Sequence, residues 1–243
     1  TSRRAGFYQC KTPLGFIMEE IMFDRLERLI GTENLDKLKN ISVLIVGVGG
    51  VGGTALEALV RCGVGHITII DKDVFDISNL NRQILSNQEN IGLSKVDVAV
   101  LRAKSINPDI DILGLNMYLN SDNIDTLKKY DFILDACDDV NAKLLLMEYA
   151  SNNNIQIISA MGTGKRLNPS DVIITRLDKT ENDPLAKKIR YEARKKGLSL
   201  KIPVVCSKEN ALNNDRVVAS SIFVPSTAGL LMAYFVIEKV INE

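Results

Sequence analysis

The sequence predicts an α/β protein with a doubly wound, mainly parallel sheet of the Rossmann type and helices on both faces. Apolar β-type runs alternate with helical stretches over the first two thirds of the chain, and strands separated by helices imply a parallel sheet. The first of these runs ends in a glycine cluster directly before a helix. After residues 162–164 the alternation stops, so we expect a C-terminal extension with strands in mixed or antiparallel directions.

The glycine cluster is the most informative motif. Residues 42–46 form an apolar strand pattern, and the helical segment 52–62 follows after four glycines: Gly47, Gly49, Gly50 and Gly52. Glycine lets a backbone turn tightly and approach an anion, while a helix N-terminus offers free N–H groups and partial positive charge. We therefore expect this loop to bind phosphate groups.

An acidic residue completes the nucleotide pattern. The next strand, residues 66–70, ends in Asp71, about 20 residues past the glycines, where a carboxylate often holds ribose hydroxyls. The chain is therefore expected to bind an adenine nucleotide. A glycine pattern of this kind most often binds a redox dinucleotide, and a tight turn without any ligand is the remaining alternative.

The other elements are predicted from periodicity and capping residues. Helical spacing covers residues 19–38, with Gly31 as a stop signal, and further helices are expected at 94–106, 121–129, 141–153, 184–196 and 226–241. Strands are expected at 110–115, 131–136, 155–160, 171–177 and 202–205, and residues 222–224 lead into the last helix. Apolar periodicity, N-cap residues and Asn-Pro stops are the signals used.

Composition sets limits on the class of protein. The chain has 243 residues with 30 basic and 30 acidic side chains, so any nucleic-acid site must be a local patch. Its four cysteines, Cys10, Cys62, Cys137 and Cys206, contain no CxxC pair, which argues against structural zinc and fits a reducing cytoplasm. The longest apolar run, residues 228–236, is too short for membrane insertion.

The periodicity of the sequence also suggests the limits of the domain. Residues 1–16 lack useful periodicity and are interpreted as a disordered extension or a cloning remnant. Residues 17–243 are expected to form one domain, with a nucleotide-binding half at about 40–161 and a substrate-side half at about 162–243.

Polar residues after the second strand favour ATP over a nicotinamide cofactor. Asp73, Asn79, Arg82 and Gln83 follow Asp71 closely. An arginine fork suits phosphate oxygens and Asn79 can orient a phosphate or metal, whereas a dehydrogenase has no use for such a group. A solvated loop is the alternative.

Two further positions point to the same chemistry. Lys95 stands at a helix start, where it can reach a bound phosphate, although taken alone it reads better as a surface lysine. Asp135, Asp138 and Asp139 follow a buried strand, at the edge where ligands bind in doubly wound sheets. Asp138 is the expected magnesium ligand and Asp139 the expected helix cap.

Together these residues resemble the ubiquitin-activating-enzyme-like superfamily of ThiF-type adenylyltransferases. Its marks appear in order over about residues 25–161: the G-x-G-G-x-G loop, the Asp71 and Asp73 pair, N-x-x-R-Q, the downstream Lys95, and D-x-x-D at 135–138. The resemblance implies ATP and Mg²⁺, with a carboxylate attacking the α-phosphate to give an acyl adenylate and pyrophosphate.

One branch of that superfamily matches more of the chain. Residues 22–31, 81–84, 106–108, 179–186 and 219–229 resemble the tRNA threonylcarbamoyladenosine dehydratases. The resemblance implies activation of the threonyl carboxylate of modified adenosine 37 in ANN-decoding tRNA, followed by attack of an intramolecular nitrogen that closes a cyclic hydantoin. Such a ring closure needs no catalytic cysteine and benefits from high effective molarity.

The resemblance also assigns roles to residues. Gly47, Gly49, Gly50 and Gly52 would hold phosphates, Asp71 would bind ribose with support from Asp73, and Asp138 would hold Mg²⁺. Asn79, Arg82 and Lys95 would bind the triphosphate and stabilise charge at the α-phosphate, and Gln83 would contact phosphate or support Arg82. Arg28, with Arg25 as the alternative, would reach the partner subunit's ATP site in a homodimer, and some relatives carry a monovalent cation, Na⁺ or K⁺.

The substrate-side half supplies candidate tRNA contacts. The helix at 184–196 carries a basic stripe of Lys187, Lys188, Arg190, Arg194, Lys195 and Lys196, which is equally well read as a solvated face. Lys165 and Arg166 are expected closer to the pocket, and residues 207–218 are read as a mobile loop or substrate lid.

Other functions stay open at this stage. The main alternative is activation of the C-terminal glycine of a ubiquitin-like sulfur carrier, with a sulfur-transfer partner such as a cysteine desulfurase. Missing zinc cysteines and the segment at 179–186 argue against it. Cys206 is interpreted as a buried strand cysteine rather than a nucleophile. A nucleotide-binding scaffold without turnover and a nicotinamide dehydrogenase fit the sequence less well.

Overall fold

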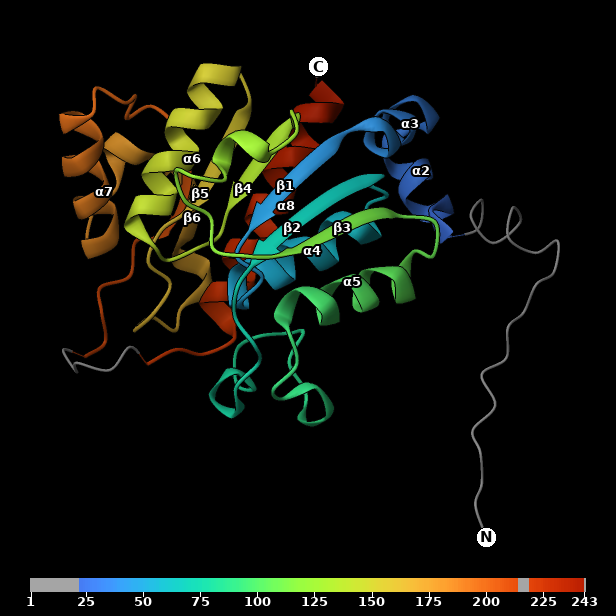
Figure 1. The fold of residues 1–243 in the computed structure, drawn as a ribbon, viewed down its shortest axis with the longest axis horizontal. Helices are drawn as coiled ribbons and strands as arrows, with labels where there is room; N and C mark the ends of the chain where they lie inside the picture. The colour runs from blue at the N-terminus through green and yellow to red at the C-terminus, as the bar shows by residue number, and fades with distance from the viewer. Residues whose placement is uncertain (1–21, 214–218, 243) are drawn as a thin grey trace, which may run out of the picture.

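The computed structural model describes residues 22–213 and 219–242, and its centre is a twisted seven-stranded sheet (Figure 1). The strands are β1 (Ser42–Val46), β2 (His66–Asp71), β3 (Asp111–Asn116), β4 (Phe132–Asp135), β5 (Gln156–Ala160), β6 (Val172–Arg176) and β7 (Pro203–Ser207). Their order is β3-β2-β1-β4-β5-β7-β6. All neighbours are parallel except β6 and β7, so the predicted α/β class and the antiparallel extension are confirmed.

Helices cover both faces of this sheet. The α-helices are α2 (Asp24–Ile30), α3 (Thr32–Asn40), α4 (Gly50–Arg61), α5 (Lys95–Ile106), α6 (Val140–Asn153), α7 (Pro184–Lys195) and α8 (Phe223–Asn242). One core lies between the sheet and α3, α4, α5 and α8. On the opposite face, two smaller cores lie under α6 and α7. Because β1 is buried on both faces, its side chains form the continuous apolar run that the sequence shows.

The closest helix contact joins α8 to α4. A methyl group added at Gly229 of α8 would lie 2.3 Å from the carbonyl oxygen of Val51 and 2.9 Å from Cβ of Thr54. Only a glycine allows the two helices to approach this closely. Thr54 Oγ1 and Ser226 Oγ lie 3.3 Å apart across the same contact. The C-terminal helix is thereby fixed on the helix that follows the glycine loop.

One predicted helix is wrong. Residues 121–129 form only the short 3₁₀ turn Ile124–Thr126. The side chain of Asn123 accepts a hydrogen bond from the N–H of Asn120 and donates one to the carbonyl of Tyr118. Asn120 in turn accepts from the N–H of Asp122. These local bonds compete with helical ones, which is why Asn and Asp favour turns.

Smaller differences concern element ends. Gly31, with a φ of 85°, separates α2 from α3 where helical spacing runs from 19 to 38. The last helix begins at Phe223, three residues before the predicted start at 226. Four further 3₁₀ turns, Ile77–Asn79, Gln88–Asn90, Pro169–Asp171 and Leu177–Lys179, lie in segments that the sequence shows as loops or strand ends.

Three sequence interpretations fall partly or wholly outside the described residues. These are the extension at 1–16, the start of the helical segment at 19–38, and the loop at 207–218, of which residues 214–218 are not described. Within the described part, Ser207 belongs to β7.

The C-terminal helix bears on the membrane question. Among the described residues, α8 is the one helix whose length and composition would allow it to cross a membrane, and half of that stretch is buried inside the protein. Its apolar residues Ala228, Met232 and Val236 belong to the main core. Burial in the core is a sufficient reason for its apolar composition.

We expect the substitution Gly229→Ala to destabilise the protein by about 1–3 kcal/mol, since the added methyl group overlaps backbone atoms of α4. Urea unfolding at fixed protein concentration measures this change. The matched control is Leu230→Ala, because Leu230 is an exposed neighbour on the same helix and should change stability by about 0.5 kcal/mol or less. Equal stability of both variants would contradict the close contact between α8 and α4.

Candidate active site

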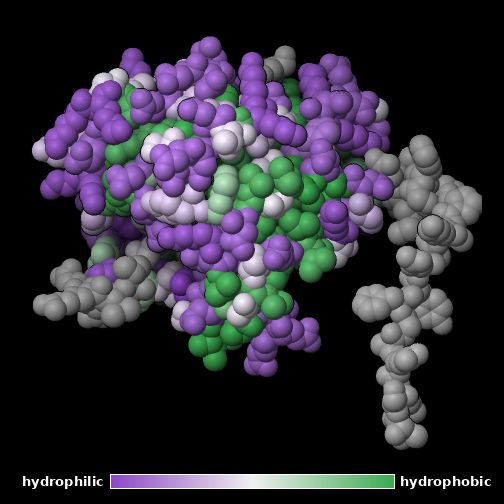
Figure 2. All heavy atoms as spheres, viewed as in Figure 1, coloured by the Kyte–Doolittle hydropathy of each residue, from purple (hydrophilic) through white to green (hydrophobic). Residues whose placement is uncertain are grey.

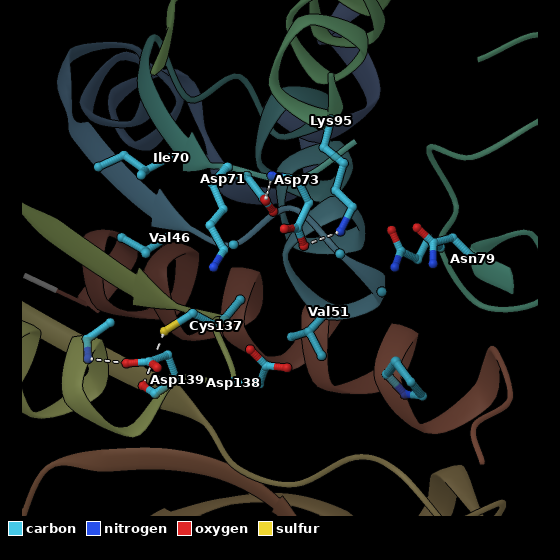
Figure 3. A pocket seen from close by; sticks show the side chains of 18 of the residues that line it. Val46, Val51, Ile70, Asp71, Asp73, Asn79, Lys95, Cys137, Asp138 and Asp139 are labelled. Atoms are coloured by element: carbon cyan, nitrogen blue, oxygen red, sulfur yellow. Dashed lines mark hydrogen bonds and ion pairs between the residues drawn. The ribbon is translucent and has the colours of Figure 1, made fainter. Parts of the chain in front are cut away.

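A cavity of about 640 Å³ lies beyond the carboxyl ends of β1, β2 and β4 (Figure 3). Val46, Ile70 and Ala136, at or just after the ends of these three strands, line its base. Strands β2 and β4 flank β1, and the chain crosses to opposite sides of β1 at this point. Doubly wound sheets bind their ligands at such a switch point. The polar residues that the sequence singles out gather here.

The glycine loop forms one wall, as predicted. Gly47 has a φ of +88°, a conformation that side chains rarely adopt, and an added Cβ would lie 2.9 Å from the carbonyl of Ala136. At Gly52 the same atom would lie 1.8 Å from the carbonyl of Gly47. Helix α4 begins at Gly50, and no side chain caps its first turn. The first N–H groups of α4 are therefore available to a phosphate group.

The acid at the end of β2 is fixed by the backbone. Asp71 accepts hydrogen bonds from the N–H of Val48 at 2.8 Å and from the N–H of Asp73 at 2.9 Å. Asp73 accepts a hydrogen bond at 3.0 Å from Nζ of Lys95, whose side chain is almost fully buried. Figure 3 shows these three residues together on one side of the cavity. The sequence predicts this grouping, although the Asp73–Lys95 ion pair follows only from the structure.

The segment after β2 supplies the next wall. Asn79 is buried, and its Oδ1 accepts a hydrogen bond from the N–H of Asp76 in a capping box that closes the turn. Arg82 lines the cavity and donates through Nη1 to the carbonyl of Ser78 at 2.6 Å. The amide of Gln83 is buried beside Gly49, and its Oε1 has no hydrogen-bond partner among the described residues. An unpartnered amide in a cavity wall is available to a ligand.

The two acids that follow β4, Asp138 and Asp139, have different roles. Asp139 caps α6 by accepting a hydrogen bond from the N–H of Ala142 at 2.8 Å. The exposed carboxylate of Asp138 lines the cavity opposite Lys95 (Figure 3) and forms no hydrogen bond or ion pair with described residues. This agrees with the predicted cap at Asp139. Burial, together with the nearby charge of Asp139, raises the pKa of the Tyr118 hydroxyl.

No preformed metal cluster accompanies Asp138. In residues 22–213 and 219–242, no group of three or more His, Cys, Asp or Glu side chains could hold a metal ion. Asp138 therefore does not belong to a metal site built from such side chains alone.

A buried ionic network lies beneath the cavity, and sequence reasoning missed its cation. Lys143 and Asp135 are both fully buried, with Nζ and Oδ2 3.0 Å apart. Lys143 also donates to the carbonyl of Ala160 at 2.7 Å and to Ser159 at 3.2 Å, and Ser159 donates to Asp135 at 2.5 Å. The available signal was a lysine among buried apolar positions of α6, eight residues after a strand-end acid. The sequence groups Asp135 with the metal-binding motif, whereas the structure places it in this network.

The cysteines of the cavity wall and of β7 have thiols whose pKa is raised by burial. Burial and the charge of Asp135 raise the pKa of the Cys137 thiol above its usual range, although this residue lines the cavity. Cys206 is buried in β7, and desolvation raises its pKa as well. The interpretation of Cys206 as a buried strand cysteine is confirmed, and Cys62 is a free thiol on the C-terminal side of α4.

Some predicted residues do not reach the cavity. Arg28 is highly exposed on α2 and pairs with Asp24 at 2.9 Å, and neither Arg28 nor Arg25 lines the cavity. Arg166, expected near the pocket as an RNA contact, is 5% exposed and donates to carbonyl groups, including those of Gly162 and Asn182. Its guanidinium therefore holds backbone in place, and Arg166 is not among the residues that line the cavity.

The substrate-side half adds wall residues to which the sequence assigned no role in the site. Thr163, from the loop after β5, and Ser220 and Pro225, which precede or begin α8, line the cavity. Ser220 and Pro225 belong to the segment 219–229 that resembles the dehydratases, whereas Thr163 stands in no such motif, and the fold brings all three to the cavity.

The comparisons with known proteins agree with this geometry. A Bacillus subtilis (strain 168) protein named tRNA threonylcarbamoyladenosine dehydratase is 35% identical over 241 residues, covering 91% of this chain and 95% of that protein. The structure of E. coli tRNA N6-threonylcarbamoyladenosine dehydratase, TcdA, in complex with ATP has a TM-score of 0.87 at 30% identity, covering 92% of this chain and 95% of that chain.

A different relative matches a smaller share of the chain. The Saccharomyces cerevisiae (strain RM11-1a) protein named adenylyltransferase and sulfurtransferase UBA4 is 39% identical over 140 residues, which cover 57% of this chain and 32% of that protein. The sequence profile of the ThiF family matches residues 23–196, from α2 to the end of α7. With the glycine loop, the fixed acid of β2 and the cavity at the switch point in place, this chain belongs to the ThiF family.

Proposed function

We propose that this protein is an ATP-dependent tRNA threonylcarbamoyladenosine dehydratase, which converts the threonylcarbamoyl group of adenosine 37 to its cyclic hydantoin form. The observation that carries the proposal is the likeness to dehydratases over nearly the whole chain, substrate-side half included. The cavity supports it with a phosphate-binding loop, a ribose acid, two cations that suit a triphosphate, Arg82 and Lys95, and a carboxylate, Asp138, that suits its magnesium ion.

ATP binding uses the glycine loop and the segment after β2. The N–H groups of the glycine loop and the start of α4 face the phosphates, and the ribose hydroxyls donate to Asp71, whose carboxylate is held in place by Val48 and Asp73. Arg82 and Lys95 supply positive charge, and Asn79 and Gln83 complete the wall. Groups fixed before the reaction stabilise developing charge at the α-phosphate without reorganisation.

The chemistry then takes two steps. A carboxylate oxygen of the threonyl group attacks the α-phosphorus, the bond to the β-phosphate breaks, and pyrophosphate leaves. A nitrogen of the same modified nucleoside next attacks the acyl carbon, loses its proton and expels AMP, so that the net change on the tRNA is the loss of one water. Because nucleophile and acyl group belong to one molecule, no protein thiol is required, in keeping with the raised pKa of Cys137 and Cys206.

Magnesium fits the donor set. Mg²⁺ is held in nucleotide sites by one or two carboxylates together with phosphates and water, and the exposed carboxylate of Asp138 meets that need. The ion would neutralise charge on the triphosphate. A monovalent cation, Na⁺ or K⁺, belongs to the same proposal by resemblance alone.

The domain division belongs to this proposal too. We assign residues 40–161 to nucleotide binding and 162–243 to the tRNA side, within one adenylation domain at 17–243. On the tRNA side, α7 presents exposed Lys187, Lys188 and Arg194, whereas Arg190 is held by Thr180 through its guanidinium. A tRNA substrate also implies a cytoplasmic enzyme.

A homodimer would complete the site. The distance of Arg28 from the cavity of its own chain suits a residue that acts on the partner's ATP. Exposed apolar side chains support a contact between two copies, among them Ile77, Leu101 and Leu113. Figure 2 shows hydrophobic surface over the lobe that links β2 to α5. Apolar patches of this kind mark protein interfaces.

Activation of a ubiquitin-like sulfur carrier is the second candidate. Its support is the likeness to the protein named UBA4 over 57% of this chain, and this function would bring a sulfur-transfer partner such as a cysteine desulfurase. Adenylation of a carboxylate is common to both candidates, so the nucleotide site does not separate them. The substrate-side half favours the tRNA.

The first prediction tests the substrate. Deleting the gene should remove the cyclic nucleoside from host tRNA and leave the open threonylcarbamoyl nucleoside in its place, as measured by mass spectrometry of tRNA digests. Restoring the wild-type gene serves as the control. An unchanged nucleoside profile would exclude the tRNA function in that host and make a sulfur-carrier protein the next substrate to assay.

The second prediction concerns Asp138. The substitution Asp138→Asn keeps the side-chain shape but removes the charge, so the rate of cyclisation should fall about 100-fold or more, by analogy with the loss of one stabilising group in a preorganised site. Thermal unfolding should stay within a few degrees of wild type, since Asp138 has no partner among the described residues. Substituting Asp139 instead should mainly lower stability, because this residue caps α6.

The third prediction tests completion of the site in trans. Arg28→Ala and Arg82→Ala should each inactivate the enzyme, whereas subunits mixed one to one should recover about a quarter of wild-type activity, because half the dimers are mixed and each has one intact site. Arg25→Ala mixed with Arg82→Ala is the matched comparison. Failure of the Arg28 pair to recover activity, with verified subunit exchange, would assign Arg28 to its own chain or to no role.

A further inference from the structure

A second cavity lies on the outer part of the sheet, away from the nucleotide. It has a volume of about 340 Å³. Ile173 and Thr175 of β6, with Cys206 and Ser207 of β7, form its floor, and Ile173 stands opposite Cys206 in the antiparallel pair. Burial raises the pKa of the Cys206 thiol, so the floor carries no charge at neutral pH. The charge of this cavity is therefore set by its rim.

The rim of this second cavity is cationic on balance. It consists of Lys179, Glu181, Asn182 and Lys208, all exposed. Within residues 22–213 and 219–242, neither Lys179 nor Lys208 forms an ion pair. Two ammonium groups and an amide facing one carboxylate favour a ligand with a single negative charge and several acceptor oxygens.

Buried bonds hold the rim in position. Arg166 donates to the carbonyl of Asn182 at 2.8 Å and to that of Glu209 at 2.9 Å. The N–H of Lys208 donates to Asp171 at 2.9 Å. The rim lysines therefore project from backbone that is already fixed, which lowers the entropic cost of binding.

One loop borders both cavities. Thr163 lines the nucleotide cavity, while Gly162, its neighbour, accepts a bond at 2.6 Å from the same Arg166 that holds the rim of the second cavity. A long substrate can therefore place its reactive carboxylate in the nucleotide cavity. The rest of its chain, continuing past this loop, would then reach the second cavity.

We propose that the second cavity, on β6 and β7 under the 179–182 loop, binds a backbone phosphodiester of the tRNA next to the reacting nucleotide. This inference rests on the proposed function. A phosphodiester carries one negative charge and two free oxygens, which matches the rim. Among the described residues, no aromatic side chain lines the cavity, so these residues offer a nucleobase no stacking surface of the kind that single-stranded RNA sites use.

The test uses the full-length enzyme and tRNA that carries the open threonylcarbamoyl nucleoside. Fluorescence anisotropy at several KCl concentrations gives the affinity and its salt dependence. Lys179→Gln and Lys208→Gln should each weaken binding about three- to tenfold and reduce the salt slope by about 0.7, the value for one lost contact to single-stranded nucleic acid. Glu181→Gln should strengthen binding about twofold, by removing repulsion of the phosphate.

Two controls make the result decisive. Lys129→Gln removes an exposed lysine just before the amino end of β4, the middle strand of the sheet, and should change neither quantity. ATP affinity should be unchanged in all variants. The gain from Glu181→Gln cannot come from misfolding.

Failure of this inference differs from failure of the proposed function. If wild type binds and cyclises the tRNA but the Lys179 and Lys208 variants keep its affinity and salt slope, the second cavity is not a phosphate site. If wild type neither binds nor cyclises the tRNA, both the proposed function and this inference are wrong.

Discussion

The buried ion pair between Lys143 and Asp135 is the constraint on which the nucleotide site depends. Charges with no solvent contact are stable only when paired and hydrogen-bonded, and here the pair gains Ser159 and the carbonyl of Ala160. The four groups come from β4, α6 and β5, so the network fixes these three elements at the floor of the cavity. Asp138 and the helix cap Asp139 lie in the sequence between the two charged residues of the network, Asp135 and Lys143. Loss of one partner leaves an unpaired buried charge, which costs about 3–5 kcal/mol.

Most of the fold is readable from the sequence because its signals are local. The apolar run of β1, the glycine stop and the amphipathic helix that follows depend on neighbours in the chain, and so do the caps at Ser94, Asp139 and Asp183. The helix expected at 121–129 failed for an equally local reason. Asn120 and Asn123 bond to nearby backbone groups, and propensity counting does not weigh such bonds against helical ones.

The site is harder to predict from the sequence, because many of its interactions join residues that are far apart in the chain. Asp71, Arg82, Lys95 and Asp138 stand in recognisable motifs, and the structure brings them to one cavity. The partner of Lys95, the burial of Arg166 and the role of Lys143 follow from packing between remote segments. Arg166 illustrates the difficulty, because a basic residue beside a glycine turn looks like an RNA contact until its carbonyl partners are known.

The position of α8 has a consequence for how the chain reaches this fold. Its side chains complete the core over β1 and α4, elements made from residues 42–61. During synthesis, the nucleotide loop therefore stays without its covering helix until residues 223–242 have left the ribosome. Contacts of such sequence separation slow folding and leave apolar surface open to aggregation or to chaperones. If the two halves act as proposed, they are functional regions that share one core, and we expect a fragment without α8 to lose stability.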